Sequence, residues 1–330
     1  MKKWLGSCML LLTAIIWGVA FVAQSVGMEY VEPFTFNFAR YIIGAVVLLP
    51  FLKLGNPSTG KKSTGDKSLE DDLKEQNAEV KAKQKAVIKK SIIGGIGCGF
   101  LLCIASMLQQ FGIIYTNVVG KAGFITALYI ILVPVLGIFL RKKTKPLVWI
   151  CVVISVVGLY LLCVSDGYRL ELADLLLLAC ALFFAFHIIF IDYISPGTNG
   201  VLVSCVQFFV AGVCCMVAMF LFETPSFAGV LKAYIPILYT GVLSCGVAYT
   251  FQILGQKYVE PTRASLILCL ESVVSVLAGW LLLSQALSIR ELIGCVIMFV
   301  AIILAQFVQK EEPADDKKSL QMVEEPVNNR

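Results

Sequence analysis

Charge and histidine are scarce in this sequence. Only 15% of its 330 residues are Asp, Glu, Lys or Arg, and His187 is the single histidine. Soluble domains carry about 25% charged residues. Apolar residues make up 58% of the chain and the mean hydropathy is +0.86. This imbalance excludes a single water-soluble core, a disordered chain and a nucleic-acid binder, and it indicates a lipid bilayer as the surroundings.

Motifs for catalysis and for metal binding are absent as well. All twelve cysteines lie in apolar runs without a Cys-x-x-Cys pair, so we interpret them as small hydrophobic residues. The glycine run 94–99 lacks the Lys-Ser/Thr of a phosphate loop, and we expect Gly95 and Gly99 to serve close helix packing instead. No catalytic arrangement stands out. The sequence predicts no enzyme, no metal and no cofactor, and any energy source must be a gradient.

Ten apolar runs are long enough to cross a bilayer, which takes about 20 helical residues. The runs are 5–26, 34–53, 91–113, 118–140, 146–164, 172–193, 199–222, 232–255, 262–284 and 289–308. The first is too long for the core of a signal peptide. We therefore expect an all-α polytopic membrane protein with ten transmembrane helices.

Two stretches are polar: residues 54–90, which are dense in Lys, Glu and Asp, and the tail 309–330. The first is interpreted as a solvated linker, with an amphipathic helix as the alternative. If the N-terminus is cytoplasmic, 22 of the 27 Lys and Arg lie on the inner side and 5 on the outer side. This bias predicts a multi-pass protein of the inner (plasma) membrane with both termini, the stretch 54–90 and the tail in the cytoplasm.

The two halves of the chain, 5–164 and 172–308, align weakly with each other. The aligned segments are 17–21 with 184–188 and 38–41 with 205–208 at an offset of 167 residues, and Gln109, Gly112 and Tyr115 with Gln252, Gly255 and Tyr258 at an offset of 143. Each half holds five spans, and an odd number means that the second half enters the membrane from the opposite side. Such inverted repeats place one binding site near the midplane in many secondary transporters.

These residues resemble the EamA-type, ten-helix members of the drug/metabolite transporter superfamily over about residues 5–308. The most specific segment is YTNVVGKAGFITALY at 115–129, followed by Leu132-Val133-Pro134. Trp17-Gly18, Arg40 and Leu270-Glu271 with 279–283 are similar too. The sequence departs from the family pattern at Ser272, at Gln285 and in the long polar stretch 54–90. The resemblance implies a ten-helix transporter and leaves its substrate open.

Three ionisable residues inside predicted spans are candidates for binding, because a charge at a helix centre costs at least about 2.5 kcal/mol. Glu271 lies about 13 Å along its span, close to the midplane, where it can bind substrate or a proton, or be held between packed helices. Arg40 and Lys121 lie nearer the outer side, where they either extend to the interface or attract an anion. Arg40 is the better of the two for clamping a carboxylate.

Uncharged candidates are weaker. His187 is either a packing residue or a proton relay. Gln109 and Gln252, like Gln24, Asn37 and Gln207, place amides at membrane depth, where they bond between helices or line a polar cavity. Trp17 and Tyr129 can form aromatic walls or simply pack. We expect a cavity lined by the first, third, fourth, sixth, eighth and ninth spans.

Together these features predict a secondary transporter of small polar metabolites such as amino acids or related organic solutes, most simply an exporter that works by alternating access. Its expected partners are a small-molecule substrate, protons or another coupling ion, and the lipid bilayer; a homodimer is left open. Two alternatives remain. One is an exporter of hydrophobic drugs, and the other is a non-transporting membrane sensor or scaffold that acts through residues 54–90.

Overall fold

The computed structural model describes residues 2–52, 67–116, 119–141, 146–163, 171–285 and 288–307. All regular structure in these ranges is helical. The helices are α1 (Lys2–Gly27), α2 (Pro33–Leu48), the short η1 (Leu49–Leu52), α3 (Lys67–Thr116), α4 (Val119–Ala127), α5 (Tyr129–Phe139), α6 (Pro146–Cys163), α7 (Leu172–Ile194), α8 (Gly200–Phe222), α9 (Phe227–Lys232), α10 (Tyr234–Leu238), the π-helical η2 (Tyr239–Tyr249), α11 (Thr250–Gln256), α12 (Pro261–Leu268), α13 (Leu270–Leu283) and α14 (Ile289–Phe307).

The predicted membrane spans are present as helices. Eight helical segments of the described chain are long and apolar enough to cross a membrane. The other two expected spans correspond to α6 and α14, whose apolar stretches Trp149–Gly158 and Leu292–Ala301 are shorter. The protein is therefore an all-α polytopic membrane protein, and the ten-span reading of the sequence agrees with its helices.

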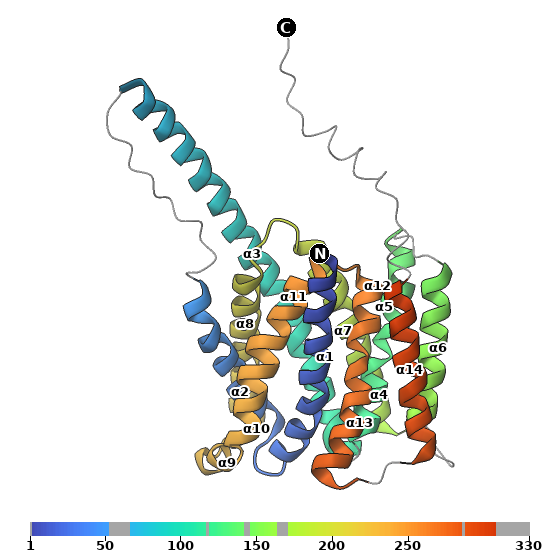
Figure 1. The fold of residues 1–330 in the computed structure, drawn as a ribbon. Coiled ribbons are helices and arrows are strands. Elements are labelled where there is room, and N and C mark those ends of the chain that lie inside the picture. Colours follow the sequence, from blue (N-terminus) through green and yellow to red (C-terminus); the bar gives the residue numbers. More distant parts are fainter. Residues whose placement is uncertain are drawn as a thin grey trace.

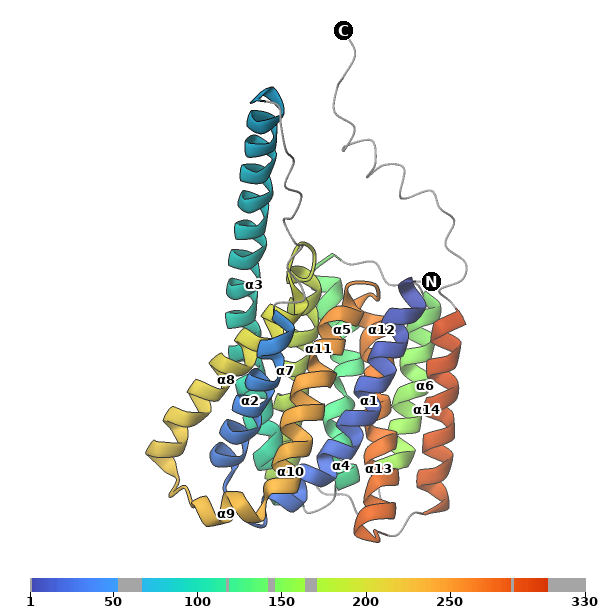
Figure 2. The ribbon, with the colours of Figure 1, turned by 60° about the vertical axis from the view of Figure 1, so that its left-hand side comes forward.

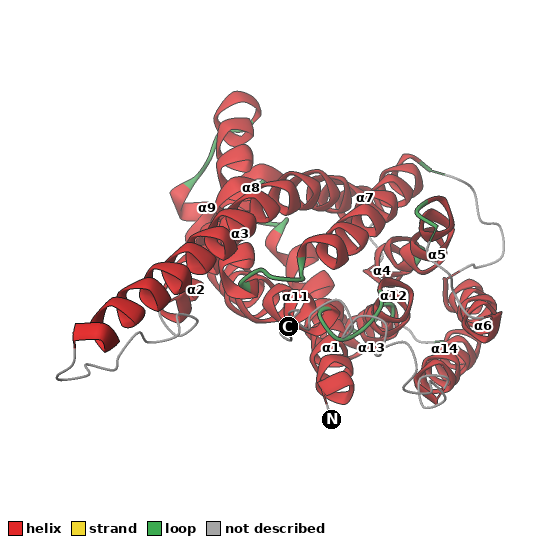
Figure 3. Ribbon diagram, turned by 90° about the horizontal axis from the view of Figure 1, so that it is seen from above, coloured by secondary structure: helices red, strands yellow, loops and turns green. Residues whose placement is uncertain are grey.

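The helices run up and down in one bundle (Figure 1). The N-terminus and the α7–α8 and α11–α12 connections lie at the upper face of this view, whereas α9 and the α1–α2 connection lie at the lower face. We call these the upper and lower faces. Seen from above, α6 and α14 pack side by side at one edge of the bundle (Figure 3). The remaining spans surround the centre, where Glu271 and Arg40 are buried.

Residues 67–90 correct the prediction of a solvated linker, because they form the first part of the 50-residue helix α3. This part projects beyond the upper face of the bundle (Figures 1 and 2). Its sequence is rich in Lys, Glu, Ala and Gln, all good helix formers, and contains no Gly or Pro. The helix therefore continues out of the apolar segment. Residues 54–66 lie outside the described residues.

Close packing through Gly95 and Gly99 is confirmed. A Cβ atom at Gly95 would lie 3.0 Å from the carbonyl oxygen of Val203, and one at Gly99 would lie 2.9 Å from that of Gln207. Both carbonyls belong to α8, so the two glycines allow α3 to approach the α8 backbone. The glycine run is a helix-packing surface between the first and second halves of the chain.

Two spans are broken at nearly equivalent places, two residues apart in the register of 143. The span Val119–Phe139 is interrupted at Leu128, and Pro261–Leu283 is interrupted at Cys269. The backbone angles are almost the same, with φ −61° and ψ −9° at Leu128 and φ −63° and ψ −10° at Cys269. The ψ values are closer to zero than in an α-helix, so the regular helical geometry is interrupted at both residues. Tyr129 and Glu271 follow the two breaks.

Candidate functional site

A narrow cavity lies at the centre of the bundle. Its volume is about 20 Å³, which is room for roughly one water molecule. It is lined by Trp17, Ala20, Phe21, Gln24, Arg40, Gln109, Tyr129, Phe184, Ile188, Ser244, Tyr249, Gln252 and Glu271. All six spans expected to line a cavity contribute to it, and α2 adds Arg40.

The structure brings together six of the eight residues singled out from the sequence. Those that line the cavity are Glu271, Arg40, Trp17, Gln109, Gln252 and Tyr129. The other two lie elsewhere. His187 is buried behind the cavity wall, and Lys121 lies at the start of α4, toward the lower face.

Arg40 is a buried cation held by neutral groups. Its side chain is 3% exposed. The guanidinium donates to Gln24 Oε1 at 2.8 Å and to the hydroxyl of Tyr41 at 3.2 Å, and it lies 4.9 Å from the centre of the Tyr41 ring. Its Nε has no partner, and no carboxylate of the described chain pairs with it. The guanidinium is therefore suited to bind an anionic group that enters the cavity.

Glu271 provides a carboxyl group from the other half of the chain. Its side chain is 3% exposed, and its Oε1 accepts a 2.9 Å hydrogen bond from the hydroxyl of Tyr129. No cation of the described chain pairs with it. Gly18 lets α1 approach this residue, because a Cβ there would lie 2.8 Å from the Glu271 carbonyl oxygen. The carboxyl group can accept a hydrogen bond from a cationic or hydroxyl group of a ligand, or bind a proton.

Aromatic rings form one wall of the cavity. The Trp17 and Tyr249 ring centres lie 4.6 Å apart. His187 lies behind them, with its ring edge-on to Tyr249 at 6.0 Å and its Nε2 within 3.2 Å of Gln207 Oε1. The structure therefore places His187 as a support for Tyr249 and not in the lining of the cavity.

Lys121 forms ion pairs that connect the two halves of the chain. Its Nζ lies 2.9 Å from Asp174 Oδ1 and 3.4 Å from Glu171 Oε2. Both carboxylates belong to the start of α7, where Glu171 and Asp174 also form a capping box. Lys121 is thus paired with protein carboxylates in this conformation.

Equivalent positions of the two halves meet around the cavity. Three pairs line it together: Trp17 with Phe184, Phe21 with Ile188, and Gln109 with Gln252. A fourth pair packs nearby, since the rings of Tyr41 and Phe208 are stacked 6.0 Å apart at an angle of 11°. The offsets of 167 and 143 residues found in the sequence therefore describe a real structural register. This is the arrangement expected of two inverted repeats that surround one site.

Ser244 and Tyr249 also line the cavity, and neither was predicted from the sequence. Both lie in the π-helical segment η2, five residues apart. A π-helix bonds residues i and i+5, so it turns different residues to one side than an α-helix does. The α-helical pattern alone could not place Ser244. Tyr249 could have been found, because it lies one turn before Gln252.

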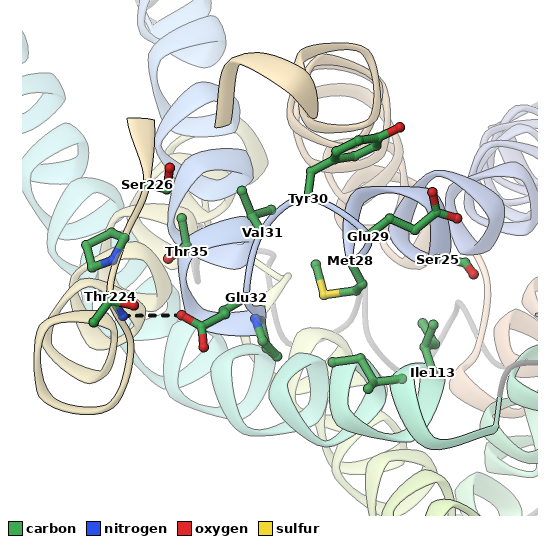
Figure 4. Close-up of a pocket in the computed structure, with 13 residues that line it drawn as sticks. Ser25, Met28, Glu29, Tyr30, Val31, Glu32, Thr35, Ile113, Thr224 and Ser226 are labelled. Atoms are coloured by element: carbon green, nitrogen blue, oxygen red, sulfur yellow. Dashed lines mark hydrogen bonds between the residues drawn. The ribbon is translucent and has the colours of Figure 1, made fainter. Parts of the chain in front are cut away.

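A second, larger cavity opens at the lower face (Figure 4). Its volume is about 500 Å³, and we call it the vestibule. It is lined by Ser25, Met28, Glu29, Tyr30, Val31, Glu32, Pro33, Thr35, Ile113, Ile114, Thr224, Pro225 and Ser226. Carboxylates connect its walls. Glu223 accepts hydrogen bonds from the backbone N–H groups of Phe34 and Thr35 at 2.6 and 2.8 Å, and Glu32 accepts one from the Thr224 N–H at 3.2 Å.

The vestibule and the central cavity are close to each other along three helices. Ser25 follows Gln24 on α1, and Ile113 lies one turn beyond Gln109 on α3. On α2, Thr35 precedes Arg40 by five residues. The vestibule therefore ends within about one or two helical turns of the central cavity, on the side away from the N-terminus.

The described residues contain no group of three or more His, Cys, Asp or Glu side chains that could hold a metal ion. Ten cysteines are described and all are free; seven of them are buried, which agrees with their interpretation as small hydrophobic residues. The polar groups of the central cavity are amides, hydroxyls, one guanidinium and one carboxyl. This set is suited to binding a polar organic molecule.

Known proteins resemble this chain over most of its length. An uncharacterized transporter of Archaeoglobus fulgidus is 28% identical over 301 residues, which cover 89% of this chain and 83% of that protein. The uncharacterized transporter YoaV of Bacillus subtilis is 23% identical over 89% of this chain and 94% of its own. A crystal structure with 15% sequence identity superimposes with a TM-score of 0.69, covering 93% of this chain and 99% of the other; this likeness shows the fold alone.

The model of the EamA-like transporter family matches residues 4–164 and 171–307. The two matches lie on the two sides of the region where the inverted halves meet, and together they include every span that lines the cavity. The resemblance found in the sequence is confirmed by this match. The chain is a membrane transporter that belongs to the EamA-like transporter family.

Proposed function

We propose that the protein is a secondary transporter, and in cells an exporter, of small zwitterionic metabolites such as amino acids. The observation that carries this proposal is the presence of two opposite charges, Arg40 and Glu271, in one cavity without ion-pair partners in the described chain. A solute with a carboxylate and an ammonium group satisfies both. Its carboxylate accepts two hydrogen bonds from the guanidinium, and its ammonium donates to the Glu271 carboxylate.

The volumes of the two cavities support alternating access. The central cavity, at about 20 Å³, is too small for an amino acid, whereas the vestibule, at about 500 Å³, is not. Ligand pockets usually measure about 300–1,000 Å³. The bundle must therefore open before a substrate binds at Arg40 and Glu271. The breaks at Leu128 and Cys269 provide matching hinges for this movement, one in each half.

The orientation is part of the proposal. Lys81, Lys83, Lys85, Lys89 and Lys90 all lie on the projecting part of α3 or at its base, on the face where the chain begins. The positive-inside rule favours this face as cytoplasmic. We therefore place both termini in the cytoplasm of a bacterial or archaeal inner membrane and the vestibule on the outer side. Residues 5–164 and 172–308 act as the two repeats, and 309–330 as a cytoplasmic tail.

Transport by the purified full chain in liposomes tests the proposal. The probe is a ¹⁴C-labelled mixture of the twenty amino acids, compared with labelled acetate and labelled ethylamine, which each carry one of the two charges. We expect uptake of the amino-acid mixture alone. Uptake should be lost in Arg40→Gln and in Glu271→Gln, and kept in Lys232→Gln and Glu260→Gln, which remove exposed charges outside the cavity.

Other results would contradict the proposal. Unchanged uptake in both cavity variants would remove Arg40 and Glu271 from the binding site. Uptake of a hydrophobic cation such as tetraphenylphosphonium, without any uptake of amino acids, would favour the drug exporter. No uptake of any probe by folded protein, with a cellular effect that depends on residues 54–90, would favour the sensor or scaffold.

A further inference from the structure

Three sulfur atoms meet between α3 and α8, apart from the central cavity. The Sγ atoms of Cys103 and Cys215 lie 3.9 Å apart, and Cys215 Sγ lies 3.9 Å from Met107 Sδ. Cys103 and Met107 are four residues apart on α3 and therefore share one face of that helix. Cys215 approaches them from α8 and is 1% exposed. We call these three residues the sulfur cluster.

The spacing matches the ligand set of a three-coordinate metal ion. A metal–sulfur bond is about 2.3 Å long. In a planar trigonal site, bonds of this length place the sulfur atoms about 4.0 Å from one another. Both measured separations are 3.9 Å. The third pair, Cys103 and Met107, is four residues apart on α3, which places both side chains on one face of that helix.

The chemistry of the donors selects the ion. Thiolate and thioether sulfurs bind soft ions such as Cu(I), whereas carboxylates, carbonyls and water suit Mg²⁺, Ca²⁺ and Mn²⁺. A polar neighbour of the cluster is the Asn37 side-chain amide, whose Nδ2 donates to Met107 Sδ at 2.9 Å. No carboxylate of the described chain makes a hydrogen bond to the cluster. Zinc is bound in proteins by Cys, His, Asp and Glu, and the methionine thioether of this cluster is not among those ligands.

The charges of a bound ion can be balanced locally. Binding Cu(I) to two thiols and one thioether releases two protons and leaves a complex of charge −1, with no change in oxidation state. Such a charge is costly inside a membrane unless it is compensated. The Arg40 guanidinium lies close enough to Cys215 to interact with it electrostatically. Arg40 is therefore a positive charge near the position of such a dithiolate complex.

We propose that Cys103, Met107 and Cys215 form a binding site for a soft monovalent metal ion, Cu(I), between the first and second halves of the protein. None of the three residues lines the central cavity, so the metal ligands are separate from the proposed substrate site, although Arg40 is near both. One of the three ligands is a methionine.

Competition for Cu(I) tests the site in the purified full chain under anaerobic, reducing conditions. Bathocuproine disulfonate, which is coloured when it binds Cu(I), reports the free ion. We expect the protein to withdraw one equivalent of Cu(I) that Cys103→Ser and Cys215→Ser do not withdraw. Cys98→Ser, a buried cysteine on α3 outside the cluster, should retain it. Met107→Leu should weaken the binding about tenfold or more.

X-ray absorption on the wild-type protein provides a second test, and its result does not depend on whether the variants fold. The expected spectrum is that of Cu(I) with three sulfur neighbours at about 2.3 Å, falling to two sulfurs in Met107→Leu. A wild-type site with two sulfurs, or with nitrogen or oxygen neighbours, would overturn the proposal. The same Cu(I) stoichiometry and affinity in Cys103→Ser and Cys215→Ser would overturn it as well.

Discussion

The two halves of this transporter share their scaffold and differ in their charges. Trp17 and Phe184 occupy equivalent positions in the cavity wall, and so do Gln109 and Gln252. Arg40, however, aligns with Gln207, which does not line the cavity and bonds to His187 instead. Equivalent backbones thus form a symmetric frame. The side chains that can select a substrate occur where the two sequences differ.

The same contrast holds for the helices. The fourth and ninth spans are broken with nearly identical backbone angles at Leu128 and Cys269. In the eighth span, by contrast, η2 is π-helical, whereas the equivalent part of α3 is α-helical and packs through Gly95 and Gly99. In the proposed alternating-access mechanism, the breaks in both halves would let the bundle open toward either face while one set of groups binds the solute.

Replacing Arg40 by the residue at the equivalent position of the second half should have the largest effect on transport. Arg40→Gln gives the first half the residue that the second half has at Gln207. Truncating one partner of a buried, hydrogen-bonded charge pair costs about 2–5 kcal/mol, so we expect amino-acid uptake to fall about 100-fold or more. Liposome uptake measures it. Arg40→Lys keeps the charge without the planar fork and should recover only part of the uptake; full recovery would argue against a bidentate contact.

A smaller effect is expected where α1 approaches α13. A side chain at Gly18 would collide with the Glu271 carbonyl oxygen, whereas the equivalent position in the second half already holds Ala185, which is fully buried. Overpacking costs about 1–3 kcal/mol. Gly18→Ala should therefore lower the thermal unfolding temperature in detergent, and Ala185→Gly should lower it less. Equal losses in the two variants would show that the halves do not differ here.

The ion pair of Lys121 is found in one half only, because the equivalent position in the second half is Ala264. Its carboxylate partner Asp174 is 1% exposed in the side chain, and the Lys121 side chain is 17% exposed. We expect Lys121→Met and Asp174→Asn to be coupled in a double-mutant cycle by about 0.5–3 kcal/mol of unfolding free energy. Thermal unfolding of both single variants and the double variant gives the value. Strictly additive losses would mean that the pair does not hold α4 to α7.

The smallest effect concerns Lys257, whose first-half equivalent, Ile114, lines the vestibule. Lys257 lies between two spans, and its Nζ donates to the Thr198 carbonyl oxygen at 2.7 Å. Desolvation by burial lowers the pKa of Lys257 from its ordinary 10.5. The unfolded chain then binds more protons than the folded one at pH values between the lowered pKa and 10.5, so stability should rise with pH in that interval.

The pH dependence of thermal unfolding, compared between wild type and Lys257→Met, measures this contribution. The rise should be absent from the variant, and it should remain in Lys232→Met, which removes an exposed lysine. A wild-type stability that falls over the same interval would contradict the sign of the effect.

Much of the fold could be predicted from the sequence. Runs of apolar residues gave the spans to within a few residues, as at α6, which begins at Pro146 as expected. Residues 67–90 were predicted wrongly, because their polarity suggested a linker while their helix propensity favoured a continuation of α3. The length and hydropathy of an apolar run predict which residues are buried in lipid. They do not predict whether the helix continues beyond the membrane into water.

The cavity residues that could be predicted from the sequence are those whose burial in a membrane costs free energy. Glu271 and Arg40 were found this way, because an ionisable group inside a span requires a reason. Lys121 met the same criterion and lies outside the cavity, since Asp174 and Glu171 from another span pair with it. Ser244 was missed because a π-helix changes which residues share a face.

The sequence by itself determined the solvent, the number of spans, the inverted register and the candidates at its unusual charged positions. These follow from local composition and from spacing along one chain. Only the tertiary structure decided which candidates meet: that Tyr129 donates to Glu271, that Arg40 lacks a carboxylate partner in the described chain, and that Cys215 joins Cys103 and Met107. Such contacts join residues up to 142 positions apart, and their distances depend on how the helices pack.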